Sequence, residues 1–504
     1  MKRNFFFASL LIGACLSTAT PSMAQDKLVK LTTVKEIGQS ITIAVNHSKG
    51  ITVDWGDGQA VPYQTDKTEA IFNIEGKVKG EVITVSGGPN WRVLSCKNCG
   101  ITNIDLSQAK KLQSLYCQNN KIDSLNLSGM TSLIDLDCSN NNISKLIFTQ
   151  GSSAKEDLAS LESFNISNNK MEGKYNLKIE KLKHLNVANN NFSSLYVFDR
   201  NIQTIICNNN KIKSYLNLNS MKNLNNLVCG NNEITSLMFA TNGEQMKQLY
   251  CENNKIESID LEKADGLLAL VCSNNNIKSY NASKESAPNI IYVDNNSLTF
   301  SCLPSKREAP KYLSFEPQNA FDLSKAPGVK TKDGIPYIQL APSWAEAREY
   351  GINLQKECSL SNGRTDAYFA WYSINPDGSE TQLKQRKNPS GEGDFYANSG
   401  IFGFFNPYKK AYVKLTSRSY GFVIKSLPIA IGDDVTAVEN VTAANNGLTV
   451  SVADGAIVLN SNTAIVVNIF TIDGKQVWKN TISGETSVSL PKGVYVVNGK
   501  KVIL

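Results

Sequence analysis

The most reactive side chains of this 504-residue chain belong to its 11 cysteines, and Cys96 and Cys99 have the C-x-x-C spacing of zinc and redox sites. No second pair of cysteines follows at that spacing, and the chain has only 2 histidines, His47 and His184. Because Cys96 also belongs to a periodic series of apolar positions, we interpret both cysteines as structural.

Other signs of chemistry are sparse. The sequence contains no metalloprotease helix motif, nucleophile elbow, phosphate-binding loop or dinucleotide fingerprint. Asp54 and Asp57 are possible calcium ligands, but no fuller acidic loop accompanies them, and a turn is the preferred interpretation. The sequence therefore predicts no enzyme, no catalytic residue, no metal and no cofactor, while calcium binding near Asp54 stays open.

The element that positions most of the cysteines is a repeat with ten copies between residues 94 and 296. Each copy has an apolar residue, any residue, a cysteine or aliphatic residue, two further residues and usually an asparagine. The common step, as from Cys96 to Cys117, is 21 residues, which is typical of leucine-rich repeat solenoids. The cysteines of the repeat are Cys96, Cys117, Cys138, Cys207, Cys229, Cys251 and Cys272. The asparagines are Asn120, Asn141, Asn169, Asn190, Asn210, Asn232, Asn254, Asn275 and Asn296.

Alternation within each copy predicts a short strand. Leu249 and Cys251 fall on its inner face and Tyr250 on its outer face. The asparagine follows where the strand must turn, and a buried amide can donate to and accept from the backbone of a neighbouring coil. Cysteines in successive coils are parallel and poorly oriented for cross-links, so we expect free thiols. Cys302 and Cys358 lie outside the repeat, and their pairing stays open.

The outward residues of the strands are the candidate partner-binding positions. The last five copies place apolar or aromatic residues there, and we add the aromatic residue of the second copy. The candidates are Tyr116, Ile206, Val228, Tyr250, Val271 and Tyr292. Polar columns beside them, including Glu252 and Asp294, would form the rim of an interface. Two alternatives stay open: β-forming residues simply favour strands, or the chain's own loops cover them.

The ends of the chain bear on its location. Residues 1–24 have the basic start, apolar run and small-residue cleavage site of a secretory signal peptide, and the run ending at Cys15 offers a lipoprotein alternative. The formal net charge is +7, or +5 without Lys2 and Arg3, with no dense basic run, so nucleic acid is not an expected partner. No later apolar stretch is long enough to cross a bilayer.

The remaining segments alternate like strands. Residues 25–88 include the run from Val53 to Gly58, VDWGDG, which resembles the signature of PKD-like β-sandwich modules and implies a β cap on the solenoid of 89–300. Residues 301–345 are proline-rich and are expected to form a connector and the second solenoid cap. Residues 346–430 have the pattern of an Ig-like β-sandwich without its disulfide.

The end of the chain resembles a sorting signal. After a linker at 431–445, residues 446–504 contain Ile469 to Lys475 and the ending from Leu490 to Leu504, which resemble the C-terminal sorting domain of the type IX secretion system of Bacteroidetes. The resemblance implies a β-sandwich, contact with that secretion machinery, passage across the outer membrane, and attachment to the cell surface or release.

The cysteine repeat is similar to that of internalin-J-like bacterial surface proteins. Its motif Leu-x-Cys-x-x-Asn-x-Ile is intact at Leu115–Ile122, Leu136–Ile143, Leu227–Ile234, Leu249–Ile256 and Leu270–Ile277. The sequence thus predicts a mainly β, exported, adhesin-like protein that binds a protein or glycan on host or bacterial surfaces. The alternatives are a structural component that scaffolds other exported proteins and, least favoured, an enzyme with an unrecognised site.

Overall fold

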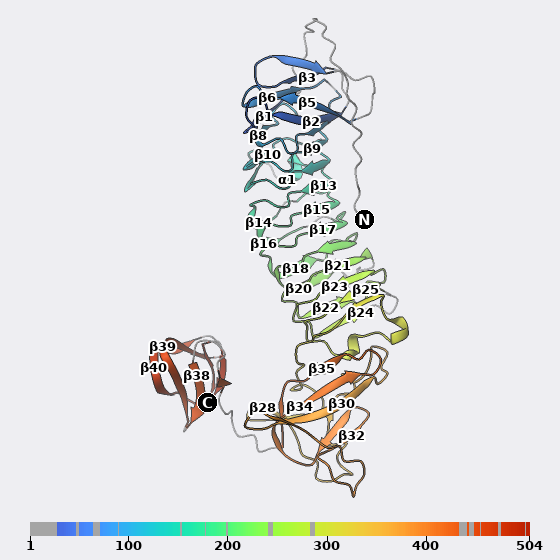
Figure 1. Cartoon of the computed structure of the whole chain (residues 1–504), viewed down its shortest axis with the longest axis vertical. Coiled ribbons are helices and arrows are strands. Elements are labelled where there is room, and N and C mark those ends of the chain that lie inside the picture. The colour runs from blue at the N-terminus through green and yellow to red at the C-terminus, as the bar shows by residue number, and fades with distance from the viewer. Residues whose placement is uncertain are drawn as a thin grey trace. The chain divides into compact units, whose positions relative to one another are not determined.

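The structure, a computed structural model, describes most of the chain (Figure 1). The described residues are 28–46, 50–63, 71–88, 90–151, 154–176, 178–197, 200–239, 245–282, 288–432, 441–442, 448–453, 455–471, 475–498 and 500–504. The predicted signal peptide, the lipoprotein site at Cys15 and most of the predicted linker lie outside them. No helix among the described residues has the length and apolar character needed to span a membrane.

Two compact units divide the chain. The first contains the chain up to Asp322 together with Leu354–Ala370 and Val413–Leu427, and the second contains Leu323–Asn353, Trp371–Tyr412 and the remainder from Pro428.

The first unit begins with a β cap. Its strands are β1 (Leu28–Thr33), β2 (Ser40–Asn46), β3 (Ile51–Asp54), β4 (Ala60–Tyr63), β5 (Ile71–Lys77) and β6 (Val82–Ser86). Strand β2 pairs antiparallel with β7 (Val93–Ser95), and β1 pairs antiparallel with β8 (Ile101–Asp105). Both strands of the first coil are therefore paired, so its backbone is not left as an open sheet edge.

The solenoid is built on one long sheet of parallel strands that follow each other in register (Figure 1). After β7 they are β9 (Ser114–Tyr116), β11 (Asp135–Asp137), β13 (Ser163–Asn165), β15 (His184–Asn186), β17 (Thr204–Ile206), β19 (Asn226–Val228), β21 (Gln248–Tyr250), β23 (Ala269–Val271), β25 (Ile290–Tyr292) and β26 (Tyr312–Ser314). The mainly β solenoid of about ten coils is thus confirmed, and β26 adds an eleventh strand beyond the ten copies of the motif.

The opposite wall of the solenoid contains separate two-stranded parallel sheets. They are β10 (Ser124–Asn126) with β12 (Lys145–Ile147), β14 (Glu172–Tyr175) with β16 (Asn191–Leu195), β18 (Lys213–Leu218) with β20 (Glu233–Phe239), and β22 (Ser258–Leu261) with β24 (Ser279–Ala282). The longest step of the repeat contains α1 (Ala154–Asp157). The Asp157 carboxylate accepts hydrogen bonds from the amides of Gly129 and Thr149, at 2.6 and 2.7 Å, which fix this insertion against the coil before it.

Aromatic residues close the far end of the solenoid. Two 3-10 turns, η2 (Phe300–Cys302) and η3 (Lys306–Glu308), precede β26. The rings of Phe315 and Phe422 stack with their centroids 5.2 Å apart, and Tyr420 stacks on Phe422 at 5.4 Å. The Tyr420 hydroxyl donates to the Pro304 carbonyl oxygen at 2.9 Å. Residues 413–427 therefore cover the last coil within the first unit.

Residues 329–431 contain two further sheets. Their strands are β27 (Val329–Lys332), β28 (Ile335–Ile338), β29 (Ile352–Asn353), β30 (Ala367–Ile374), β31 (Glu380–Gln382), β32 (Phe395–Asn398), β33 (Ile401–Phe404), β34 (Tyr408–Ser417), β35 (Val423–Lys425) and β36 (Ile429–Ile431). Strands β29, β33 and β32 form one sheet and the other strands form the second. Trp371 packs edge-on against Phe404, with ring centroids 4.8 Å apart, in a buried aromatic core.

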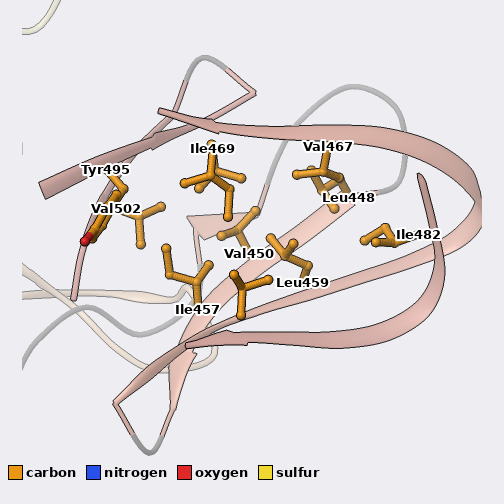
Figure 2. Packing of buried hydrophobic residues seen from close by; sticks show 11 residues of the cluster. Leu448, Val450, Ile457, Leu459, Val467, Ile469, Ile482, Tyr495 and Val502 are labelled. Atoms are coloured by element: carbon orange, nitrogen blue, oxygen red, sulfur yellow. The ribbon is translucent and has the colours of Figure 1, made fainter. Parts of the chain in front are cut away.

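The last sheet packs its apolar residues into a core of its own. Its strands are β37 (Val441–Thr442), β38 (Leu448–Ala453), β39 (Ala456–Thr471), β40 (Gln476–Ser489), β41 (Val494–Val497) and β42 (Lys500–Ile503). Figure 2 shows Ile457 and Leu459 of β39 beside Val450 of β38, with Tyr495 and Val502 completing the cluster.

Candidate binding face of the solenoid

The interior of the coils is set by the leucine and cysteine positions. Leu249 and Cys251 are fully buried, and the same positions of the other coils are buried as well. Every described cysteine is a free thiol, including Cys302 and Cys358. Burial raises the pKa of Cys207 to about 12 and has the same effect on Cys302. These thiols therefore stay protonated and act as small apolar side chains.

The asparagine after each strand links neighbouring coils through its amide. Asn254 Nδ2 donates to the carbonyl oxygens of Cys229, Cys251 and Glu252, at 3.0, 3.1 and 3.2 Å. Its Oδ1 accepts from the Ile234 amide at 2.9 Å. All nine ladder asparagines accept a backbone amide from the preceding coil in this way. The ladder thus satisfies backbone groups where the strand turns.

Two parts of this framework were missed in the sequence. Gln318 continues the ladder, because its Nε2 donates to the Val293 carbonyl at 2.9 Å and its Oε1 accepts from the Leu298 amide at 2.9 Å. The sequence signal for this further coil was the 22-residue step from Val293 to Phe315. Phe315 stands at the position that cysteine occupies in other coils. In all ten copies of the motif the residue before the ladder position, which is Cys99 in the first copy and an asparagine in the other nine, is an asparagine in left-handed conformation, as at Asn253 with a φ of 55°. The repeated Asn-Asn pair was the signal for this turn.

The C-x-x-C pair is structural in its contacts. Cys96 is fully buried, and Cys99 takes the ladder position, with its Sγ 3.3 Å from the Thr42 carbonyl oxygen. Burial raises the pKa of Cys99 to about 11, so the thiolate needed for metal binding or redox exchange is disfavoured. The Asn120 amide oxygen accepts from the backbone amides of Cys99 and Ile101, which ties this first turn to the next coil.

The acidic turn in the cap is used by its own backbone. Asp54 Oδ1 accepts from the amides of Gly56, Asp57 and Gly58, at 2.8, 3.1 and 3.0 Å. Asp57 pairs with Lys79 at 2.7 Å. This geometry is that of an Asx turn, and no cluster of three or more potential ligands among His, Cys, Asp and Glu occurs within the described ranges.

Five of the six candidate binding residues lie side by side. They lie in register on the five adjacent strands β17, β19, β21, β23 and β25. In strand order they are Ile206, Val228, Tyr250, Val271 and Tyr292. Four of the five are half-buried, while 37% of the Tyr292 surface is exposed. We call these five residues the apolar column. Adjacent parallel strands are about 4.8 Å apart, so the column extends over roughly 19 Å.

The sixth candidate, Tyr116, is separate from the apolar column. Asp137, Asn165 and Asn186 occupy the three outward positions between it and Ile206. The Tyr116 hydroxyl donates to Asp135 Oδ2 at 2.7 Å. Burial, together with this carboxylate, raises the pKa of Tyr116 to about 12. Its polar end is therefore already occupied within the chain.

Further apolar residues that are exposed or half-buried lie beside the apolar column in the last coils. Ile290 precedes the buried Ile291 on β25, and its register partner Tyr312 is 48% exposed. Leu268, just before β23, is also 48% exposed. The second column consists of Ile290 and Tyr312, which lie two residues before Tyr292 and Ser314 on β25 and β26, while Ala269, the register partner of Ile290 on β23, is buried. The sequence prediction followed only one outward residue in each coil and therefore missed this column, although its position on the same strand was the available signal.

Carboxylates border the apolar column on the side where the strands end. Glu252 and Asp294 lie two residues after Tyr250 and Tyr292. Asp294 accepts from the Ser273 hydroxyl at 2.7 Å and from Asn295 Nδ2 at 2.9 Å. Together, the two columns and this edge place apolar side chains next to negative charge.

Comparison with known proteins finds similarity to solved structures only. No protein-family model and no curated protein matches the sequence. The structure is similar to the functional domain of InlJ from Listeria monocytogenes, which includes a cysteine ladder, at 13% identity and a TM-score of 0.31, over 72% of this chain and 94% of that one. YopM from Yersinia enterocolitica is similar at 17% identity and a TM-score of 0.26, over 47% of this chain and 71% of that one. The internalin InlF from Listeria monocytogenes is similar at 15% identity and a TM-score of 0.23, over 45% of this chain and 87% of that one. These similarities concern the fold alone.

Proposed function

We propose that this chain is a non-enzymatic recognition protein whose apolar column binds a partner protein. The observation that supports this most is the run of apolar outward residues from Ile206 to Tyr292 on adjacent strands. The interior of the solenoid is built in the same way from β11 to β15, where the outward residues Asp137, Asn165 and Asn186 are polar. The fold therefore does not require apolar residues at these positions.

The composition of the face supports the proposal. Tyrosines supply a large contact area with few rotatable bonds and are enriched among the residues that dominate binding energy. Tyr292 and Tyr312 remain substantially exposed in the folded chain, so their burial by a partner would remove apolar area from water. We expect the two tyrosines of the apolar column, Tyr250 and Tyr292, to be its main anchors.

Substitution of these tyrosines tests the proposal. The full chain and its Tyr250→Ala/Tyr292→Ala variant would be compared in capture of proteins from host matrix and bacterial surface extracts, followed by a direct affinity measurement with the captured protein. The matched control is Tyr196→Ala/Tyr215→Ala, which removes two exposed tyrosines near the opposite wall. We expect affinity to fall at least about tenfold in the first variant only. Equal affinity of all three proteins would refute the proposal.

We further propose that the protein acts outside the cell, as an internalin-like surface or secreted protein. This part rests on the secretory signal peptide that the sequence predicts in residues 1–24 and on the resemblance of residues 446–504 to a type IX sorting domain. From the VDWGDG run at Val53 to Gly58 we propose a PKD-like identity for the cap, and from the strand pattern of residues 346–430 we propose an Ig-like identity for that region. Deletion of 446–504 should keep the chain in the periplasm of a host with that secretion system, and unchanged export would exclude the sorting role.

A further inference from the structure

In the last coils, acidic and basic side chains lie on opposite sides of the face that carries the apolar column. Glu252 and Asp294 lie on the side where the strands end. Lys311 lies on the opposite side, with its Nζ 5.1 Å from the centre of the Tyr312 ring. Between these edges are the exposed rings of Tyr292 and Tyr312. A partner that fits this face must therefore present positive charge beside an apolar side chain at the acidic edge.

The two carboxylates of the acidic edge have no cationic partner within the part of the chain that the structure describes. The ion pairs found there involve other acidic residues, such as Glu162, Glu233 and Glu257. Asp294 is held by the neutral donors Ser273 and Asn295. Its negative charge is thus oriented but not neutralised.

Glu252 is less well satisfied than Asp294. Its carboxylate lies over Gly230, where an added Cβ would be only 2.4 Å from Glu252 Oε1. Its Oε2 is buried and has no hydrogen-bond partner among the described residues. A buried carboxylate oxygen without a donor is destabilising. Because the Glu252 side chain as a whole is only half-buried, rotation of its own bonds can bring the carboxylate to a donor at the surface.

We propose that the ligand of this face is a lysine- or arginine-containing protein segment. Its cationic groups pair with Glu252 and Asp294, and its apolar side chains pack on the rings of Tyr250 and Tyr292. The proposal rests on the binding function proposed above and specifies the chemistry of the partner. A basic segment is favoured although the whole chain has a formal net charge of +7, because the local edge, rather than the net charge, supplies the attraction.

Peptide binding to the full chain tests the proposal. The probe is a short labelled peptide in which lysine alternates with leucine and tyrosine, and its counterpart carries glutamate in place of lysine. We expect the basic peptide to bind more tightly than the acidic one, with an affinity that falls as salt is raised. No binding of the basic peptide, or equal binding of both, would overturn the proposal.

Charge-neutralising variants locate the interaction. Glu252→Gln/Asp294→Asn keeps the side-chain shapes and should weaken binding of the basic peptide at least about tenfold. The matched control, Asp260→Asn/Glu262→Gln, changes the net charge equally at exposed positions on or next to β22. An equal loss in the control would show general electrostatic attraction and would overturn the proposal.

The capture experiment described under the proposed function, repeated with both double variants, separates the two proposals. If Tyr250→Ala/Tyr292→Ala weakens capture of a partner and Glu252→Gln/Asp294→Asn does not, the face binds but its ligand is not basic. If neither double variant changes capture, the binding function of the face is itself refuted. Circular dichroism of each variant establishes that the solenoid remains folded.

Discussion

The earlier and later coils of the solenoid share an interior but differ in their outward residues. From β11 to β15 the outward residues are polar and are satisfied within the chain. Asp137 Oδ1 accepts from the amide and hydroxyl of Ser139, at 3.0 and 2.6 Å. Asn165 accepts in the same way from Ser167. From β17 to β25 the outward residues are instead aliphatic or aromatic.

This difference separates what the fold requires from what it permits. The buried leucine and the ladder asparagine occur in both halves because each coil must fill the interior and satisfy its backbone. The outward position carries no such requirement, since aspartate, asparagine, valine and tyrosine all occur there. We therefore attribute the variation in residue type at the outward position to contacts that this surface makes outside the solenoid interior.

The largest expected effect tests whether the interior is equivalent in the two halves. Asn141 and Asn254 each make three amide donations and accept one backbone amide. Replacing either with alanine should lower the free energy of unfolding by about 3 kcal/mol, because several buried backbone groups lose their partner. Urea unfolding followed by circular dichroism measures this. If either variant lost less than about 1 kcal/mol of its free energy of unfolding, the interiors of the earlier and later coils would not be equivalent.

The buried thiols predict sensitivity to alkali. Burial raises the pKa of Cys207 from 9.0 to about 12, so the unfolded thiol releases its proton first as pH rises. The stability contributed by the protonated thiol is complete below pH 9 and is lost between about 9 and 12. Val187 occupies this position in the preceding coil. At pH 7 the free energy of unfolding of Cys207→Val should therefore differ from that of the parent by less than about 1.5 kcal/mol. At pH 11 the variant should be more stable than the parent by about 2 kcal/mol.

Two unfolding curves, at neutral and alkaline pH, measure this difference. Cys207→Ser is a useful control, because it puts a hydroxyl in the apolar interior and should destabilise the fold at both pH values. An identical pH dependence of Cys207→Val and the parent would show that the thiol does not contribute to alkaline unfolding.

A smaller effect distinguishes the outward residues of the halves. Asp137→Ala removes the acceptor for the amide and hydroxyl of Ser139 and should lower the free energy of unfolding by about 1 kcal/mol. Val271→Thr, a change of similar shape in the apolar column, should change it by less than about 0.5 kcal/mol because the side chain is half-exposed. Thermal unfolding of both variants gives the comparison, and a reversed order would contradict it.

The smallest effect concerns Tyr116. Tyr116→Phe removes the hydrogen bond to Asp135 and should lower stability at pH 7 by less than about 1 kcal/mol. The parent pKa is raised to about 12, so its stabilising contribution is present below pH 10 and declines from about 10 to 12. The phenylalanine variant lacks this decline. Ultraviolet titration of tyrosine in the two proteins would reveal the missing late-titrating group.

The repeat made the interior of the solenoid predictable from sequence. Leu249, Cys251 and Asn254 recur at a fixed period, and alternation alone separates buried from outward residues. The eleventh strand was missed because Phe315 and Gln318 replace the usual residue types while keeping their geometry.

Other features depend on contacts between coils that one copy of the motif does not contain. The position of Glu252 over Gly230 requires knowing which coil each side chain leans toward. The placement of the half-buried Ile290 next to the exposed Tyr312 depends on the strand register at the end of the solenoid. The apolar column and its polar rim, including Glu252 and Asp294, could be predicted as an arrangement, but the contacts of those two carboxylates could not.

The central claim is that the later half of the solenoid face binds a partner while the earlier half does not. The most direct measurement is the affinity of the full chain for its captured partner, compared between Tyr250→Ala/Tyr292→Ala and Asn165→Ala/Asn186→Ala. We predict at least about a tenfold loss for the tyrosine variant, little change for the asparagine variant, and a folded solenoid in both. A loss confined to the asparagine variant, or no loss in either, would contradict the claim.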